Sequence, residues 1–419
     1  MQNHCRTARE LKQSERQNTR VLWEEVFAED SKAFLDYYYK EVTAQNRIYV
    51  EEEQGELISM LHLNPYKVHM GTTEADVYYM VAVATKEAYR HQGCMRRVLK
   101  ASLTELYSEQ VPFVFLMPAS ERIYQPFDFR TVAMQNMISF GQVPKLSKEK
   151  GLYMQKVPGI HAVQKEQKTL QCRPMRKEEL PKLAEFSESA LARCSVVYTK
   201  REISYYDRIC REQESMNGGI LLFYRGTTLA GYCFHGDEGG VEAWEIVIVP
   251  EDKEDIEAEV SGEDRVHNDS MSQAYANAEA IQALCEYFRD RLPIRILGTM
   301  PGSAIAGIEA REISYRPMTM VRIVNVEAFA GQLRSKEPVE FFIEVKDPFI
   351  EENSGIYRFV ISQTKGCAER ISQCGERDTE YPRILIGELA ECFFGLRKCI
   401  GIPTEKIQLL RPVYLNEIV

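Results

Sequence analysis

The sequence lacks the long apolar runs and the basic excess that mark membrane-spanning and nucleic-acid-binding chains. No stretch approaches the ~18 consecutive apolar residues that a membrane-spanning helix needs. The chain has 52 Lys and Arg against 62 Asp and Glu, a formal net charge of −10, whereas binding to a polyanion needs a basic surface. The composition therefore predicts no membrane and no nucleic acid as partner.

Signals for secretion and for metal binding are missing as well. The first residues, MQNHCRTARELKQSER, have no apolar core of a signal peptide. The 11 cysteines form no C-x-x-C pair and the 7 histidines no H-E-x-x-H motif, so we expect no metal site. Neither Cys367–Cys374 nor Cys392–Cys399 has the C-x-x-C spacing, and the odd cysteine total and the missing secretion signal favour free, mostly buried thiols in a reducing cytosol.

What the sequence does have is the composition of a globular protein, with 44% hydrophobic and 27% charged residues. Its 419 residues correspond to about three domains. Residues 1–145 and 146–300 each alternate helices with strands, and 301–419 suggest an antiparallel sheet with a helix. The predicted fold class is therefore α/β followed by α+β.

Hydrophobic periodicity places the main elements of the three segments. The expected strands are 47–52, 56–63, 77–85, 111–117, 219–225, 228–236, 241–249, 294–298, 321–325, 339–346 and 355–363. The expected helices are 96–110, 178–192, 272–292 and 384–394.

The segment 81–107 carries the most informative pattern, a strand, a short loop and an amphipathic helix. The loop reads Arg90-His91-Gln92-Gly93, and a glycine there lets backbone amides converge at the start of the helix. Such amides and the helix dipole favour a phosphate, and Arg90, Arg96 and Arg97 add positive charge. From the residues alone, a phosphate loop and an incidental Arg-Gly turn both remain open.

Val83-Ala84-Thr85 followed by Ala88-Tyr89-Arg90-His91-Gln92-Gly93 resembles motif A of the GNAT acetyltransferases. The resemblance implies that the loop binds the pyrophosphate of acetyl-CoA and that the preceding strand pairs with its pantetheine arm. Met95 stands where the family has Gly or Ala. The cofactor-binding residues implied in this way are Val83, Ala84, Thr85, Arg90, His91, Gln92, Gly93, Cys94, Met95 and Arg96.

The segment from Ser120 to Phe129, SERIYQPFDF, is similar to the Ile-Tyr-x-x-Phe segment of Eis-like (enhanced intracellular survival) acetyltransferases. Asp128 and Phe129 replace the usual Gly-Tyr. The resemblance implies that Tyr124 is the catalytic acid, with a packed aromatic residue as the alternative. Ser120 is expected either to hydrogen-bond the cofactor or Tyr124, or to face solvent.

The whole chain fits the Eis layout of two tandem GNAT units and a C-terminal sterol-carrier-like α+β domain. The expected domains are a catalytic, acetyl-CoA-binding domain (1–145), a degenerate GNAT domain (146–300) and a sterol-carrier-like domain (301–419). The family also implies a homo-oligomer, often a hexamer, and an active-site base formed by the α-carboxylate of the last residue. That residue is Val419, and its apolar side chain suits a buried terminus.

The second unit has no R-x-x-G-x-G/A loop. Residues 251–269 hold nine acidic residues and only two basic ones, so a diphosphate would meet like charge there. This segment is expected to be a solvated surface, with recruitment of a cationic substrate as the alternative. One active centre per chain follows.

The sequence therefore predicts an acetyl-CoA-dependent N-acetyltransferase that acts on primary amines by direct transfer in a ternary complex, without an acyl-cysteine at Cys94. Acceptors would be aminoglycoside- or polyamine-like small molecules or protein lysines, and the protein would be cytoplasmic. The alternative is a non-catalytic carrier or scaffold that binds an apolar ligand in the C-terminal domain.

Overall fold

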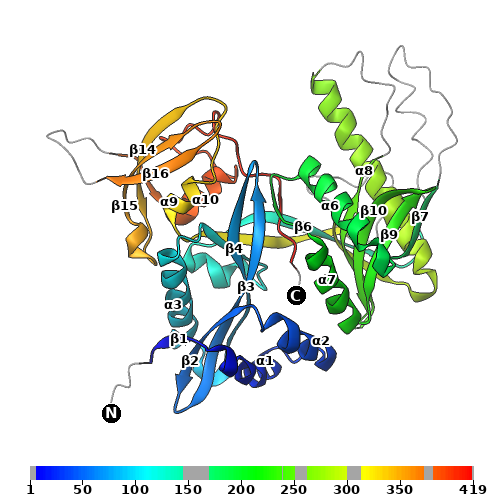
Figure 1. Cartoon of the computed structure of the whole chain (residues 1–419), viewed down its shortest axis with the longest axis horizontal. Coiled ribbons are helices and arrows are strands. Elements are labelled where there is room, and N and C mark those ends of the chain that lie inside the picture. Colours follow the sequence, from blue (N-terminus) through cyan, green and yellow to red (C-terminus); the bar gives the residue numbers. More distant parts are fainter. Residues whose placement is uncertain are drawn as a thin grey trace. The chain divides into compact units, whose positions relative to one another are not determined.

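The computed structural model describes residues 6–144, 169–237, 239–250, 262–299, 313–371 and 381–417. The chain divides into two compact units (Figure 1). Unit 1 comprises Met1–Met134, Ser195–Lys200 and Pro317–Val419, and unit 2 comprises Gln135–Cys194 and Arg201–Arg316. The division into domains 1–145, 146–300 and 301–419 stays a prediction.

Unit 1 is built on a mixed sheet in which most strands follow the order of the sequence. Its main path runs β1-β2-β3-β4-β5-β13, and β8 and β18 extend it from β3. The bounds are β1 (Ala8–Glu10), β2 (Arg47–Glu53), β3 (Glu56–Met70), β4 (Thr73–Thr85), β5 (Phe113–Leu116), β8 (Val197–Thr199), β13 (Ile313–Ile323, in unit 1 from Pro317) and β18 (Val413–Tyr414).

Tight turns fix the register of the first strands. Gln54 and Gly55 both have positive φ, +53° and +83°, the backbone of a two-residue hairpin turn that matches the twist of the strands. β3 and β4 form a longer antiparallel hairpin. β5 then lies parallel to β4, and all four of its residues are buried, as expected for a central strand.

Helix α3 (Cys94–Ser108) packs on this sheet through one apolar face. Its buried residues Cys94, Val98, Leu99, Ser102, Leu103 and Leu106 recur at helical spacing. The other helical segments of the first part are η1 (Gln13–Thr19), α1 (Arg20–Val26), α2 (Lys32–Tyr37), the π-helix η2 (Tyr38–Val42), η3 (Glu87–Tyr89), α4 (Glu121–Tyr124) and η4 (Gln125–Phe127).

The C-terminal segment of unit 1 adds a second sheet, of order β16-β15-β14-β17. Phe329 and Phe394 from this segment meet Phe113 of β5 with ring centroids 6.4 and 6.5 Å apart. The two sheets of unit 1 therefore share one core. The elements are α9 (Val326–Ala330), β14 (Val339–Lys346), η7 (Glu351–Asn353), β15 (Gly355–Ile361), β16 (Gly366–Ile371), β17 (Arg383–Leu385) and α10 (Ile386–Phe393).

A buried ion pair joins the C-terminal segment to the first part of unit 1. Both side chains, Arg322 and Asp347, are 0% exposed, and Arg322 Nη2 donates to both Asp347 oxygens at 2.7 and 2.9 Å. Arg322 Nε also donates to the Phe127 carbonyl at 2.8 Å. Asp347 Oδ1 accepts from the amides of Phe349 and Ile350. The pair is thus fully hydrogen-bonded, the condition under which a buried charge pair is tolerated.

The end of the chain is also held within unit 1. β18 pairs in parallel with β8, which pairs with β3 near Met70. Thr319 Oγ1 donates to the Leu415 carbonyl at 2.8 Å, and Thr199 Oγ1 donates to Glu417 Oε1. Residues 413–417 are all buried.

The strands of unit 2 are hydrogen-bonded in the order β6-β12-β11-β10-β9-β7, with parallel and antiparallel neighbours. Its strands are β6 (Arg130–Phe140, in unit 2 from Gln135), β7 (Leu170–Pro174), β9 (Gly219–Arg225), β10 (Thr228–Asp237), β11 (Val241–Ile248) and β12 (Ile294–Thr299). Its helices are η5 (Lys177–Glu179), α6 (Leu180–Cys194), α7 (Ile203–Ser215), α8 (Gly262–Tyr287) and η6 (Arg289–Arg291).

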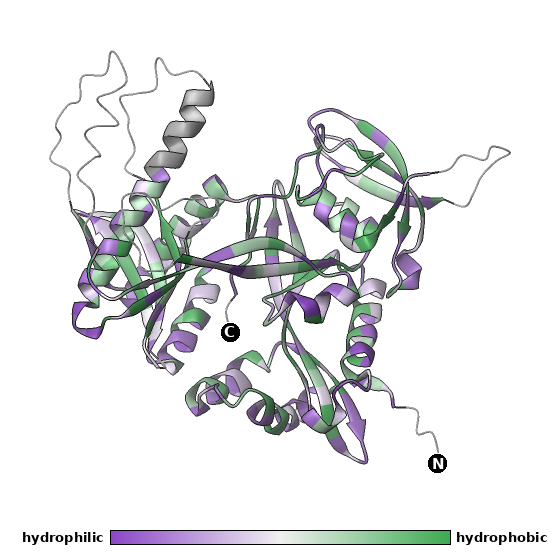
Figure 2. Cartoon of the chain, turned by 180° about the vertical axis from the view of Figure 1, so that it is seen from behind, coloured by the Kyte–Doolittle hydropathy of each residue, from purple (hydrophilic) through white to green (hydrophobic). Residues whose placement is uncertain are grey.

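Most of the elements expected from periodicity are confirmed. Figure 2 shows strands of mainly hydrophobic colour and helices that mix both colours, the patterns on which those expectations depend. The helix expected at 272–292 ends earlier, at Tyr287, and a 3-10 turn follows it. Short or polar elements were missed: β1, β6, β7, β8, α7, α9, β16, β17 and β18. The expected turn at Pro301–Gly302 lies outside the described residues.

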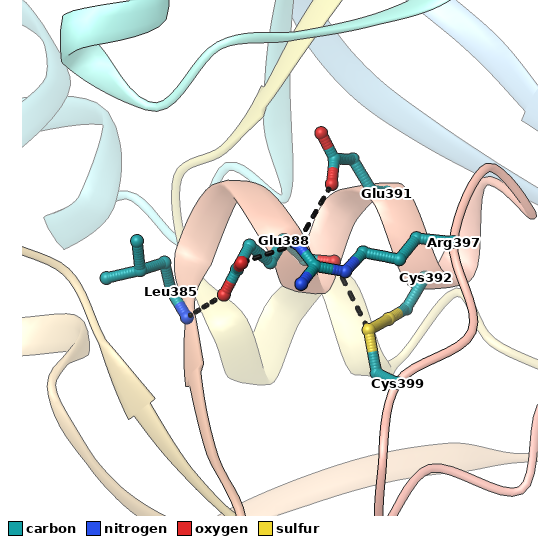
Figure 3. Close-up of a disulfide and its surroundings, with 6 residues drawn as sticks. All are labelled: Leu385, Glu388, Glu391, Cys392, Arg397 and Cys399. Carbon is teal, nitrogen blue, oxygen red and sulfur yellow. Dashed lines mark hydrogen bonds and ion pairs between the residues drawn. A yellow bond between two sulfur atoms is a disulfide. The ribbon is translucent and has the colours of Figure 1, made fainter.

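The expectation of free thiols is wrong for one pair. Cys392 and Cys399 form a disulfide with a Cα–Cα distance of 6.2 Å (Figure 3), within the usual range for such bonds. The chain turns back after α10, and no C-x-x-C spacing is needed for that approach. Seven other cysteines are free, three of them buried, while Cys5 and Cys374 lie outside the described residues.

The buried pair predicts an asymmetry between two similar substitutions. Asp347→Asn leaves the Arg322 charge buried without its counter-ion, so we expect it to cost about 3 kcal/mol of unfolding free energy. Glu340→Gln breaks the exposed Glu340–Arg358 pair and is expected to leave the urea midpoint unchanged. Urea unfolding of both variants is the measurement, and equal midpoints for the two would contradict the role of Asp347.

Candidate active site

The loop before α3 contains two residues with positive φ. His91 and Gly93 have φ of +63° and +78°, while Arg90 before them is extended. Left-handed residues beside other conformations occur in turns whose backbone N–H groups bind anions. Arg90, His91, Gln92 and Gly93 are all exposed, so the loop is open to a ligand.

The first turn of α3 adds amides to the same place. The first hydrogen bond at the helix start runs from the Arg97 amide to the Gly93 carbonyl, at 3.1 Å. The amides of Cys94, Met95 and Arg96 therefore precede the intrahelical ladder. Gly93, at the N-cap, has no side chain to cap them, and the helix dipole favours an anion there.

The three arginines expected to supply charge differ in their surroundings. Arg90 is exposed, and its Nε donates to the Thr85 carbonyl at 3.3 Å. Arg96 is exposed, with its guanidinium carbon 5.1 Å from the Phe349 ring centroid. Arg97 is instead neutralised by the buried Glu51, at 2.7 Å, so the loop has two available cations rather than three.

A β-bulge interrupts β4 just before the loop. Met60 pairs with Ala84 and His62 with Val81, so Ala82 and Val83 both lie opposite Leu61. Ala82 has a φ of +51°, which is unusual for a residue with a side chain. Such bulges bend a strand and re-aim its backbone groups.

On its other edge, β4 separates from β5. The parallel ladder between them contains the pairs Tyr78–Val114 and Tyr79–Phe115. It stops three residues before the bulge residue Ala82, so the edge from Met80 to Thr85 lies beyond it. Among the described strands none pairs with this edge at Val83, Ala84 and Thr85, so it can take an extended ligand, such as a pantetheine arm, with the Thr85 carbonyl already accepting from Arg90 Nε.

Tyr124 ends helix α4 and lies in the same hydrophobic cluster as Val83 and Met95. It is 8% exposed, its ring meets Phe129 edge-on at 5.8 Å, and burial raises its pKa to about 12. The phenol therefore stays protonated at neutral pH and can donate a proton. Ser120, at the N-cap of α4, is exposed and makes no capping hydrogen bond.

Asp128 and Met95, which differ from the residues expected in the two motifs, each fit their surroundings. Asp128 stands in the place of a glycine and has a φ of +62°, a conformation that Asp tolerates better than most residues. Arg130 Nη2 hydrogen-bonds its carboxylate at 3.1 Å. Met95 packs against the core of unit 1, so its side chain takes up core volume.

Cys94 lacks the features of a nucleophile. It is 1% exposed, and burial, with the nearby Glu51 carboxylate, raises its pKa. A reactive cysteine needs the opposite shift.

A buried polar cluster next to the bulge was missed at the sequence level. Asn46 Nδ2 lies 3.4 Å from His62 Nδ1 and 3.2 Å from Asn64 Oδ1, and Tyr38 Oη donates to Asn64 Oδ1. Burial lowers the pKa of His62 to about 3, so its ring is neutral. The signal in the sequence was the pair of polar residues His62 and Asn64 beside the apolar residues Leu61 and Leu63 of β3.

Unit 2 contains a bulge of the same kind, but its strands do not separate. Tyr232 pairs with Val247 and Phe234 with Trp244, and Glu245, at the bulge, has a φ of +53°. The parallel ladder between β11 and β12 continues past it to Ile246–Thr299. The edge that is free in β4 is therefore paired in β11.

A charge pair fills the core at the second bulge. Glu245 is 0% exposed and contacts Arg201 Nη2 at 3.2 Å, and Tyr232 Oη donates to it at 2.9 Å. The acidic segment 251–269 lies outside the residues whose side chains the structure describes.

The described residues bear on Val419, on metal ligands and on membrane-spanning helices as follows. Val419 lies outside the described residues, so its catalytic role stays a prediction. Within the described part of the chain no group of three or more metal-ligating side chains converges, and no helix is long and apolar enough to cross a membrane.

Comparison with known proteins identifies the class. Residues 7–132 match the family model of the acetyltransferase (GNAT) domain. The chain therefore contains a GNAT acetyltransferase domain and is an enzyme of the N-acetyltransferase class. Comparison of the sequence with curated proteins gives no match.

Solved structures share the fold at low identity. A probable N-acyltransferase of unknown function from Enterococcus faecalis is 15% identical with a TM-score of 0.67, over 94% of this chain and 90% of that chain. A GCN5-related N-acetyltransferase from Kribbella flavida is 13% identical with a TM-score of 0.65, over 93% and 89%. Eis1 from Mycobacterium abscessus is 13% identical with a TM-score of 0.59, also over 93% and 89%.

The loop geometry predicts that Gly93→Ala weakens CoA binding. A left-handed alanine costs about 1 kcal/mol, and its Cβ would lie 3.1 Å from Arg97 Nη1. The loop relieves both by leaving the conformation that converges the amides, so we expect Kd for CoA to rise about fivefold.

Calorimetric titration with CoA is the measurement, and Gly55→Ala is the matched control. Gly55 has a φ of +83° with nothing within 4 Å of its Cβ position, so that variant carries similar strain away from the loop. The same Kd in both variants would contradict the assignment of the loop.

Proposed function

We propose that the protein transfers the acetyl group of acetyl-CoA to a primary amine, directly and within a ternary complex. The observation that carries this proposal is the free edge of β4 beside the amide-lined loop before α3. An extended cofactor with a diphosphate at one end needs both features next to each other.

The residues present fit acetyl-CoA. The amides of the Arg90–Gly93 loop and of the first turn of α3 face the diphosphate, and Arg90 and Arg96 balance its charge. The arm pairs with the backbone of Val83–Thr85, which polarises the thioester carbonyl in the manner of an oxyanion hole. His91 and Gln92 are exposed members of the same loop.

The protein's own groups handle the two protons of the reaction. Tyr124 protonates the departing thiolate. Its raised pKa keeps the phenol protonated until that step. The acceptor ammonium loses its proton to the α-carboxylate of Val419, which continues from the buried residues 413–417. Direct attack by the amine needs no acyl-cysteine, in agreement with the raised pKa of Cys94.

We further infer that unit 2 is a second, degenerate GNAT unit and that the C-terminal segment is a sterol-carrier-like domain. The bulge at Glu245 supports the first inference, because a bulge with a positive-φ residue also interrupts β4 at Ala82. The continuous β11–β12 ladder and the buried Arg201–Glu245 pair favour its inactivity. The likeness to Eis1 supports an Eis-like arrangement.

The acceptor is proposed to be a polycationic small molecule or a protein lysine, attracted by the net charge of −10. We also propose a cytoplasmic homo-oligomer of hexameric size, as the resemblance implies. The Cys392–Cys399 disulfide is the one observation that does not favour a reducing compartment.

The direct test is incubation with acetyl-CoA and a panel of polyamines, aminoglycosides and lysine peptides. Free CoA is measured by chromatography, because a thiol reagent would also report protein cysteines. The Arg90→Ala/Gly93→Asp double variant is the blank. Release of CoA that depends on the acceptor and exceeds that of the blank supports the acetyltransferase proposal. No release of CoA, together with no thermal stabilisation by acetyl-CoA, would favour a non-catalytic carrier or scaffold.

The assignment of the acid predicts that Tyr124→Phe lowers kcat about 100-fold and leaves the Kd for CoA unchanged. In the wild-type enzyme, the pKa of about 12 predicts that Tyr124 stays protonated and causes no fall in kcat between pH 7 and 10. Tyr357→Phe, at another buried tyrosine, is the control with expected normal kcat. Full turnover in the Tyr124 variant would reject this acid.

The assignment of the base predicts that deletion of Val419 alone lowers kcat at least tenfold. The deletion withdraws the terminal carboxylate by one residue, about 3.5 Å of extended chain. Val419→Ala keeps the carboxylate in place and should retain most activity. The two variants are compared in the CoA-release assay, and equal activity would remove the terminal carboxylate from the mechanism.

A further inference from the structure

Phe349 of the C-terminal segment packs against helix α3 and against η4, the turn that follows Tyr124. It is 3% exposed, and its ring contacts Phe127 at a centroid distance of 5.2 Å. Arg96, in the first turn of α3, has its guanidinium carbon 5.1 Å from the ring centroid, and Lys100 Nζ and the Arg322 guanidinium lie at 5.8 and 5.6 Å. A residue remote in sequence thus contacts the helix that begins at the loop and the turn after Tyr124.

The backbone of Phe349 is fixed at both ends. Its amide donates to Asp347 Oδ1 at 2.9 Å, and its carbonyl accepts from Lys100 Nζ on α3. Asp347 is itself held by the buried pair with Arg322. The backbone is thus held in place, and the ring is held by its burial and by its contact with Phe127.

Arg96 gains a defined position from this ring. A guanidinium over an aromatic ring is held by the cation–π attraction and by stacking, while its N–H donors stay available. Arg96 is exposed and makes no ion pair in the part of the chain that the structure describes. A positioned cation loses less conformational entropy when it binds a phosphate than a free side chain does.

We propose that Phe349 is a positioning residue that orients Arg96 toward a phosphate of CoA. This inference rests on the proposed function, since it takes CoA as the ligand of the loop. It gives the C-terminal segment a part in cofactor affinity, in addition to its place in the shared core.

The test is calorimetric titration with CoA together with the KM for acetyl-CoA. Phe349→Leu removes the ring face while keeping an apolar side chain, so we expect Kd and KM to rise five- to tenfold with kcat within twofold. Phe359→Leu is the matched control, because Phe359 is a fully buried phenylalanine stacked on Phe341 in the same segment. That variant should lose stability but keep the wild-type Kd.

A double-mutant cycle with Arg96→Ala isolates the proposed route. If Phe349 acts through Arg96, Phe349→Leu has no further effect on Kd when Arg96 is already alanine. An unchanged Kd in Phe349→Leu, an equal rise in Phe359→Leu, or additive effects of the two changes would overturn the inference. If Phe349→Leu does not fold, Phe349→Met, which is closer in volume and also lacks the ring, takes its place with the same expectations.

CoA binding by the unchanged protein and by Phe349→Leu distinguishes a failure of the proposed function from a failure of the role of Phe349. If the unchanged protein binds no CoA, the proposed function is wrong and the inference falls with it. If it binds CoA and Phe349→Leu does not weaken that binding, only the role of Phe349 is rejected.

Discussion

The buried pair of Arg322 and Asp347 is the constraint on which the active unit depends. Desolvation of two charges is costly, and here the cost is offset by a bidentate contact and by hydrogen bonds to the Phe127 carbonyl and to the Phe349 and Ile350 amides. Through these bonds one ion pair fixes the turn after Tyr124 and the loop that lies against α3. Together with the shared hydrophobic core, these bonds join the first part of the chain and the C-terminal segment in one unit.

The comparison of the two bulged strands shows how units 1 and 2 differ at the candidate active site. In unit 1 the ladder between β4 and β5 ends before Ala82, and the loop that follows presents amides and two cations. In unit 2 the ladder passes the bulge at Glu245, and a buried charge pair with Arg201 occupies the core. The site therefore depends on the separation of two strands and not on the bulge alone.

Local patterns in the sequence predicted the helices and strands with strong periodicity and the turn at Arg90–Gly93 before a helix, whereas the role of Tyr124 came from the resemblance to a family and stays a prediction. They could not predict features that depend on the path of the folded chain. Cys392 and Cys399 meet because the chain turns back after α10, and Arg97 of α3 is neutralised by Glu51 of strand β2. The pairing of Arg322 with Asp347, and the separation of β4 from β5, are likewise tertiary, and no spacing of residues encodes them.

The central claim is that each chain has one cofactor site and that it lies in unit 1. The most direct measurement is the stoichiometry of CoA binding by isothermal titration calorimetry, with the wild-type protein and with the Arg90→Ala/Gly93→Asp variant. The account predicts one CoA per chain for the wild type and none for the variant under the same conditions. Two molecules per chain, or one that persists in the variant, would contradict it.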